Sequence, residues 1–334
     1  MKNNSFEVEI VNIMQKHNVK GISLAIINDY EISYYETFGN CLNSDNSAIN
    51  KNTLFQVASI SKTVFATAIM ILHENKILDI DENIGENISG WILEGKENSK
   101  ISIRELLSHN SGINVEGFDG YRIGKSIPNT LDILEGKGNS EKILKKYDDY
   151  IYSGGGYTIC QYIMEKIYEN RTFEEIMKDL LFDKLEMANS QYIVDYTEEL
   201  LKRFASSKYN IYPEYAAAGL FSTAYDIAKL GVDIQRSLLS DGILSVESAM
   251  EMLTRVNGNM HGVGFRISDD GRNFWHGGHN NEYKSHCIFS KNGKGIVILT
   301  NGNSDNIFDE LELYIKDYYK WKDFNINSFI INKL

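Results

Sequence analysis

Strand-forming segments lie near both ends of this chain and are separated by a long middle region. Residues 21–40, GISLAIINDYEISYYETFGN, contain two β-rich runs split by Asn28-Asp29, which is typical of a hairpin. After about residue 260 the chain returns to strand-like runs: GVGFRIS, NFWHGG, KSHCIFSK and GIVILTNG. The simplest architecture pairs the two groups in one antiparallel sheet.

Helical patterns account for most of the remaining chain. Apolar residues recur at helical spacing in 5–17 and 307–321, which predicts an amphipathic helix at each end. Between the strand groups, helices are expected over 63–78, 157–170 and 173–185. These helices are joined by polar loops that contain glycine, such as GINVEGFDG.

Together the patterns predict an α/β plus all-α fold, in which the terminal helices flank the antiparallel sheet and a helical lobe is inserted. The expected sheet lobe comprises residues 1–60 and 221–334, and the helical lobe comprises 61–220. The two form a single interlocked unit, and a ligand site is expected in the cleft between them.

Charge and hydropathy exclude several classes of partner. The 334 residues carry a formal net charge of −12 with no run of Lys or Arg, which argues against nucleic-acid binding. Acidic residues interrupt the apolar positions near the start, unlike a secretory leader. No stretch approaches the roughly 18 apolar residues of a membrane span, so we expect no membrane partner and a cytoplasmic location. Cys41, Cys160 and Cys287 lie far apart and are expected to be reduced packing residues.

The segment FQVASISKTVFATAIM places Ser59 and Lys62 three residues apart at the start of a buried helix. At this spacing the two side chains share one helix face, within hydrogen-bonding reach. The positive end of the helix dipole and burial against Val64, Phe65 and Ala66 both disfavour a lysine ammonium. A neutral lysine can accept the proton of a serine hydroxyl, so Ser59 is a candidate nucleophile. The alternative is a serine cap beside a solvent-facing lysine.

This segment resembles the active-site helix of the serine β-lactamase and penicillin-binding-protein superfamily, in which S-x-x-K is the first motif. ISIRELLSHNSGI, AAAGLFSTAYDIAKL and WHGGHNNEYKS are similar, in the same order, to segments of the class C β-lactamase-like branch, with its D-aminopeptidases and related esterases. The resemblance covers about residues 20–305. It implies a β-lactamase-like fold, and it leaves His109 of the first of these segments with an expected structural role.

In this branch the second motif is Y-x-N, with a tyrosine whose oxygen approaches the serine. YIYSGGGYTICQYIMEKI matches it by order, which makes Tyr152 the candidate. The alternative for Tyr152 is a core aromatic residue. Residue 154 is glycine where the family usually has an asparagine that holds the substrate amide, so β-lactams and acylated peptides are less expected substrates.

The third motif, usually Lys-Thr/Ser-Gly, is here His276-Gly277-Gly278. The replacement removes a permanent cation and a hydroxyl, while His276 is expected to donate a hydrogen bond and to change charge with pH. The two glycines allow close approach of a substrate backbone. By the family's logic, the backbone N–H groups of Ser59 and His279 form the oxyanion hole.

A metal site built from His276, His279 and His286 is an alternative interpretation of the same segment. On a strand, the odd spacing of the first two sends their side chains to opposite faces, which argues against it. No metal and no cofactor are therefore expected.

The sequence thus predicts a serine hydrolase that acts through an acyl-enzyme on a small ester, amide or peptide, with Lys62 and Tyr152 sharing the base and acid roles. Two alternatives stay open: a D-alanyl carboxypeptidase or weak β-lactamase, and a non-catalytic binding or scaffold protein of the same fold. The sequence makes no prediction of an oligomeric state.

Overall fold

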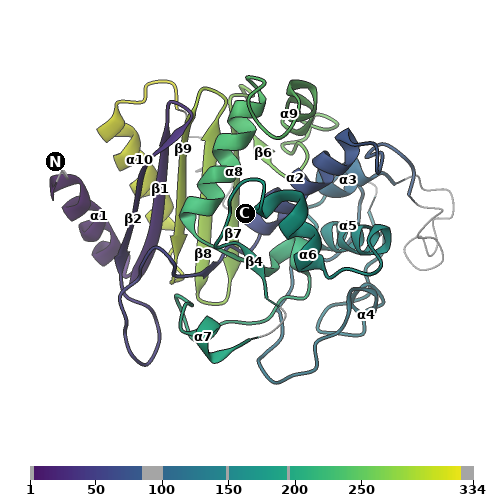
Figure 1. The fold of residues 1–334 in the computed structure, drawn as a ribbon, viewed down its shortest axis with the longest axis horizontal. Coiled ribbons are helices and arrows are strands. Elements are labelled where there is room, and N and C mark those ends of the chain that lie inside the picture. The colour runs from purple at the N-terminus through teal and green to yellow at the C-terminus, as the bar shows by residue number, and fades with distance from the viewer. Residues whose placement is uncertain (1–3, 85–100, 148–149, 194–195, 325–334) are drawn as a thin grey trace.

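A computed structural model describes residues 4–84, 101–147, 150–193 and 196–324, and all statements below refer to these residues. Within them, the chain forms one six-stranded antiparallel sheet of order β2-β1-β9-β8-β7-β6 (Figure 1). The N-terminal strand β1 pairs directly with β9, which confirms the predicted pairing of the two strand groups. The strands are β1 (Gly21–Asn28), β2 (Glu31–Gly39), β6 (Arg266–Ile267), β7 (Asn273–Asn280), β8 (Tyr283–Ser290) and β9 (Lys294–Thr300).

Alternating apolar residues give the sheet two buried faces. On β9, Ile296 and Ile298 pack with the terminal helices α1 (Asn4–Lys16) and α10 (Asn306–Tyr319). Val297 and Leu299 belong instead to the large core on the opposite face, which α8 (Ala224–Ser237) covers (Figure 1). This period of two is what a sheet buried on both sides requires. The predicted flanking of the sheet by the terminal helices is confirmed in that α1 and α10 lie together on one face.

The turn between β1 and β2 differs by one residue from the expectation. The two residues in the left-handed region are Asp29 and Tyr30, with φ of 55° and 64°, whereas Asn28 still pairs with Glu31. Two successive positive φ values are those of a type I′ turn, the turn that fits the twist of a two-residue hairpin.

The middle of the chain contains helices, as predicted, but they are short and irregular, and most of the described residues between α2 and β5 lie in loops and turns rather than in a mostly helical region. The elements are α2 (Ile60–Glu74), α3 (Ile103–Leu107), α4 (Thr130–Leu134), α5 (Gly154–Ile167), α6 (Phe173–Met177), the π-helices η1 (Lys178–Phe182) and η2 (Tyr215–Gly219), and α7 (Glu198–Leu201). A small second sheet was not predicted; its strands are β3 (Phe55–Gln56), β5 (Leu220–Ser222) and β4 (Gln191–Tyr192), in that order. The division of the chain into two lobes remains a proposal.

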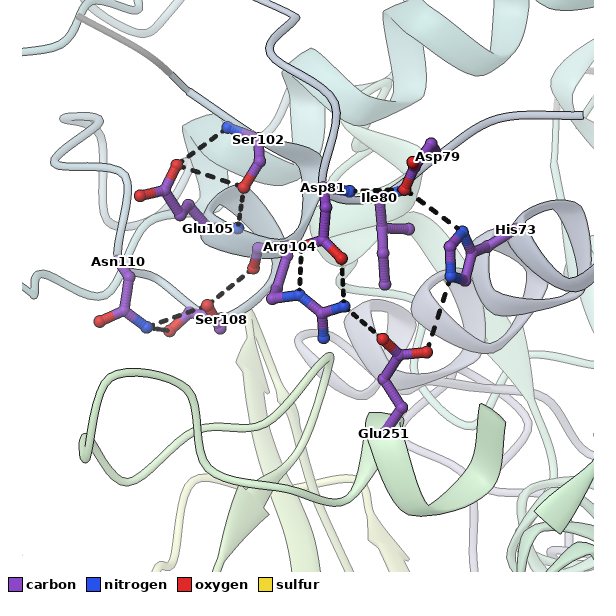
Figure 2. Close-up of polar contacts among 10 residues, drawn as sticks. All are labelled: His73, Asp79, Ile80, Asp81, Ser102, Arg104, Glu105, Ser108, Asn110 and Glu251. Carbon is purple, nitrogen blue, oxygen red and sulfur yellow. Dashed lines mark hydrogen bonds and ion pairs between the residues drawn. The ribbon is translucent and has the colours of Figure 1, made fainter. Parts of the chain in front are cut away.

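An ion-pair network fastens α3 to its neighbours (Figure 2). The Arg104 guanidinium binds both carboxylate oxygens of Asp81, at 2.6 and 2.7 Å, and also contacts Glu251 of α9 (Val246–Met252). Glu251 in turn lies 3.6 Å from His73 at the end of α2. A bidentate pair of this kind fixes orientation as well as distance. The network therefore holds α3, and the loop that follows it, against α2.

The remaining sequence expectations concern membranes and cysteines. In the part of the chain that the structure describes, no helix combines the length and the apolar composition needed to cross a bilayer. Cys41, Cys160 and Cys287 are all buried and none forms a disulfide, which agrees with the expected packing role.

Candidate active site

Ser59 and Lys62 meet as their spacing predicts. Ser59 is the N-cap of α2, and the Lys62 Nζ lies 3.1 Å from the Ser59 Oγ. Nζ also donates to the backbone carbonyl of Ala217 in η2, at 2.8 Å. The preceding residue, Ala58, has a φ of 48°, a strained conformation for a residue with a side chain. The strained turn presents the half-buried Ser59 at the end of the helix.

Ser61 takes a structural part instead. Its buried hydroxyl donates to the carbonyl of Ala58 at 2.6 Å and accepts from the N–H of Leu220 at 3.1 Å. It therefore ties the turn before α2 to β5. This agrees with the preference for Ser59 over Ser61 as the candidate nucleophile.

Burial changes the proton affinity of Lys62. The side chain is 2% exposed, and desolvation lowers its pKa from an ordinary 10.5 to about 7, against the opposing effect of the Glu116 carboxylate. Burial disfavours the ammonium because an apolar surrounding cannot solvate its charge. Near neutral pH a large fraction of Lys62 is therefore an uncharged amine that can accept a proton.

Tyr152 lies beside this pair. Its ring centroid is 5.1 Å from the Lys62 Nζ, and a hydrogen bond between its hydroxyl and Ser59 contributes to its proton affinity. Burial is the largest influence and raises the pKa of Tyr152 to about 12. The phenol therefore keeps its proton across the neutral range and can donate it.

The start of α5 holds Tyr152 in place. The next residue, Ser153, caps α5 with its hydroxyl, which also donates to the carbonyl of Asn114 at 2.8 Å. Its backbone N–H donates to the Nδ1 of His109 at 3.0 Å. The His109 ring packs against Tyr152 with 4.3 Å between the ring centroids. His109 thus has the structural role expected of it.

The space that the family's asparagine would use is filled by another loop. A Cβ atom at Gly154 would meet the Phe118 ring at 2.9 Å and the Glu116 carbonyl at 3.1 Å. Both residues belong to the loop between α3 and α4. An asparagine at position 154 would require that loop to move.

Strand β7 forms the opposite wall, and its two glycines are not equivalent. A Cβ atom at Gly278 would lie 2.4 Å from the carbonyl of Val57, 2.5 Å from the Ser285 Oγ and 2.9 Å from the backbone nitrogen of Ser59. At Gly277 the nearest atom, in the ring of His286, would be 3.6 Å away. Position 278 therefore admits only glycine, because the strand approaches the turn before Ser59 at backbone distance.

His276 does not offer the hydrogen bond expected from the sequence. Its Nδ1 faces the carbonyl of Gly277 at 2.6 Å, and its Nε2 is buried. Burial, together with the nearby Lys62, lowers the pKa of His276 to about 3. The pH dependence of its charge therefore lies far below neutral pH: near pH 7 the desolvated ring is neutral, and its one N–H donates within the strand.

A cavity of about 620 Å³ joins these groups. Ser59, Tyr152 and the residues from His276 to His279 line it, as the sequence predicts for one site. The sequence did not identify the other lining residues, since no motif marks them: Glu116, Gly117, Phe118, Asp119, Arg266, Ser285, His286, Asp305 and Phe308. Only the polar, glycine-bearing composition of residues 112–120 pointed to a loop there.

The structure does not bring His276, His279 and His286 together, as the metal-site alternative would require. His279 is exposed, and His286 pairs through its Nδ1 with the buried carboxylate of Glu312. His276 instead lies with His109 and His261, which precedes β6, in a buried cluster. Spacing along the chain gave no signal for this cluster.

Comparison with known proteins finds one family and several relatives. The family model described as Beta-lactamase matches residues 6–319. Penicillin-binding protein 4* of Bacillus subtilis (strain 168) is 26% identical over 174 residues, which are 50% of this chain but only 37% of that protein's length. The putative penicillin-binding protein PbpX of the same organism is 23% identical over 317 residues, covering 89% of this chain and 74% of its own. The solved structure of D-amino acid amidase from Ochrobactrum anthropi SV3, complexed with L-phenylalanine amide, has a TM-score of 0.74 at 19% identity, over 94% of this chain and 99% of that one.

Proposed function

Because the chain belongs to the beta-lactamase family, we propose that it is a serine hydrolase that cleaves small amides, esters or peptides through an acyl-enzyme. The observation that carries this proposal is the 3.1 Å contact between the Ser59 hydroxyl and a buried lysine amine whose pKa is about 7. A lysine kept neutral by burial is an effective base for a serine nucleophile.

Each group then has a defined role in the reaction. Lys62 takes the proton of Ser59 as its Oγ attacks the substrate carbonyl, while the backbone N–H groups of Ser59 and His279 bind the developing oxyanion. The Tyr152 phenol gives its proton to the leaving group and is reprotonated by the Lys62 ammonium. A water molecule activated by the same amine then hydrolyses the acyl-enzyme, releasing the acid and restoring Ser59. We thus assign the base to Lys62 and the acid to Tyr152, because the pKa values of about 7 and about 12 suit those tasks.

The lining of the cavity favours substrates with a free amine. Three acidic residues line the cavity together with Arg266: Glu116, Asp119 and Asp305, of which Asp305 is already paired with Lys284. Glu116 is near enough to influence both Lys62 and Tyr152. An ammonium group next to the scissile carbonyl, as in an amino-acid amide or ester, would find a partner there. The amidase of the same fold, solved with phenylalanine amide, supports this choice.

The same features weigh against penicillin recognition. Phe118 occupies the space beside Gly154, and His276 and Gly277 replace the lysine and hydroxyl of the family's third motif. We therefore expect weak or no turnover of β-lactams.

Covalent labelling tests the proposal. A fluorophosphonate should label Ser59, located by mass spectrometry of peptides, and a labelled penicillin should not; Ser59→Ala should abolish labelling and turnover while the circular dichroism spectrum stays unchanged. Phenylalanine amide should be hydrolysed faster than its N-acetyl derivative, which lacks the ammonium. Labelling by both reagents would favour a penicillin-recognising enzyme. If Ser59 is not labelled by either reagent and no substrate is hydrolysed, the result would favour the non-catalytic scaffold.

A further inference from the structure

Three imidazole nitrogens converge on one buried point behind Tyr152. They belong to His109, His261 and His276, which are 0%, 0% and 4% exposed, and one ring nitrogen from each lies within 4.8 Å of the other two. The Nε2 atoms are the ring nitrogens that have no hydrogen-bond partner among the described residues, so we take these as the converging set. A buried polar atom without a partner costs about 1–3 kcal/mol, so three at one point indicate an occupant.

The second nitrogen of each ring shows where the proton of that ring lies. The backbone N–H of Ser153 can only donate, so the Nδ1 of His109 accepts, and a neutral His109 carries its proton on Nε2. The carbonyl of Gly277 can only accept, so the Nδ1 of His276 donates and its Nε2 holds a lone pair. The Nδ1 of His261 lies 2.6 Å from the Tyr150 hydroxyl, which can act either way. Burial lowers the pKa of all three histidines, so the neutral forms are the relevant ones.

These protons decide between a metal ion and water. A zinc ion bound by three histidines requires a lone pair on each coordinating nitrogen. His109 offers an N–H at that position, and freeing a lone pair would break the hydrogen bond from Ser153 and leave a buried N–H unpaired. A water molecule accepts from the Nε2–H of His109, donates to the Nε2 of His276, and meets His261 as either donor or acceptor. A point among three atoms at this separation is within hydrogen-bond distance of all of them.

We propose that the Nε2 atoms of His109, His261 and His276 bind one buried water molecule, which links Tyr150 and His261 to the residues behind the catalytic pocket. Such waters commonly make about three hydrogen bonds to otherwise unsatisfied polar groups. The site gives His276 a function in place of the family's lysine: one of its ring nitrogens lies in the buried histidine cluster, and the water fixes the ring there.

The chain of contacts also positions Tyr152. The His109 ring packs on the Tyr152 ring with 4.3 Å between centroids, and the His261 and His276 rings each lie 6.1 Å from it. Because the water fixes the orientation of all three imidazoles, it fixes the surface against which the phenol packs. This second step rests on the proposed function, whereas the water site itself does not.

Histidine tautomers in the intact protein test the site directly. Long-range proton–nitrogen NMR spectra of the ¹⁵N-histidine-labelled protein should show His109 protonated at Nε2 and His276 protonated at Nδ1. A crystal structure at high resolution should show one water peak within hydrogen-bond distance of the three Nε2 atoms, and elemental analysis should find no stoichiometric metal. A proton on the Nδ1 of His109, a bound metal ion or a dry cavity would overturn the proposal.

Two variants test the positioning step. His261→Phe removes one partner of the water, and it should lower kcat by about tenfold or more while KM changes little. His261→Gln keeps a donor and an acceptor and should recover most of kcat. Equal losses in both variants, or none in His261→Phe, would contradict the positioning step. Labelling of Ser59 by the fluorophosphonate should persist in both, so failure here is separable from failure of the hydrolase assignment.

Discussion

Replacing Glu116 by glutamine should move the pH at which activity rises to a lower value. The proposed base, Lys62, works only as the neutral amine, so kcat/KM should rise with pH, by tenfold per unit below an inflection near pH 7, and then level off. Because the pKa of Tyr152 is about 12, the phenol stays protonated and the plateau should extend beyond pH 9. Glu116 raises the pKa of Lys62, and its neutralisation should therefore lower the inflection.

The sizes of these effects follow from burial and charge. The fall of the Lys62 pKa from 10.5 to about 7 corresponds to about 5 kcal/mol in favour of the neutral amine. Without it, roughly one lysine in several thousand would be neutral at pH 7. Glu116 is a smaller, exposed influence, for which a shift of roughly half a pH unit is expected. At pH 6 such a shift makes Glu116→Gln roughly threefold more active than the unchanged protein.

The assay separates this effect from substrate binding. Hydrolysis of p-nitrophenyl acetate, which has no ammonium group, should be followed from pH 5 to pH 9, so that loss of an amine-binding carboxylate does not alter the rate. Asp119→Asn is the matched control, since it removes a carboxylate from the same cavity that has no resolved influence on Lys62. A profile without an inflection in this range would contradict the assignment of Lys62 as the base. An upward shift in Glu116→Gln, or an equal shift in Asp119→Asn, would contradict the influence assigned to Glu116.

Three further substitutions test the packing around the site. Gly278→Ala should lower kcat/KM by about a hundredfold or more, because its Cβ would strike the carbonyl of Val57, whereas Gly277→Ala should stay within a few-fold; steady-state kinetics compares them. Lys62→Met should abolish turnover, yet in urea titrations it should raise the free energy of unfolding at pH 7 by roughly 1–4 kcal/mol. The unchanged protein should become more stable between about pH 7 and 10.5, because the unfolded lysine holds a proton there that the folded one has lost, and Lys62→Met should lack this rise. Arg104→Met should lower the free energy of unfolding by about 1–2 kcal/mol, because it removes the bidentate pair with Asp81 and leaves Glu251 only its contact with His73. Lys137→Met, at an exposed pair, should leave the urea midpoint unchanged.

The parts of the site that depend on local spacing could be predicted. Ser59 and Lys62 are one helical turn apart, so any helix starting there brings them together, and the apolar residues that follow ensure that the lysine is buried. The sheet could be predicted for a similar reason. The continuous apolar run within 294–300 is typical of a strand buried on both faces, and β1 pairs with it.

The parts that depend on which loop reaches the site could not be predicted. Glu116 and Phe118 lie in a loop of ordinary polar composition, and only the folded chain shows that Phe118 occupies the space beside Gly154. The small sheet was missed because its strands have two or three residues each, too few for a periodic pattern. In each case the deciding contact joins segments that are far apart in the chain.

The difference at His276 shows how such distant contacts change a residue's chemistry. From the sequence alone, His276 can be recognised only as a titratable hydrogen-bond donor at the position of the family's lysine. Burial near His109 and His261 removes its charge, and its one ring N–H donates a hydrogen bond to the carbonyl of Gly277. The cavity therefore lacks a cation where the family has one, while the acidic residues Glu116 and Asp119 still line it. A substrate that brings its own positive charge would restore the balance, and this is the reason for proposing amine-bearing amides and esters.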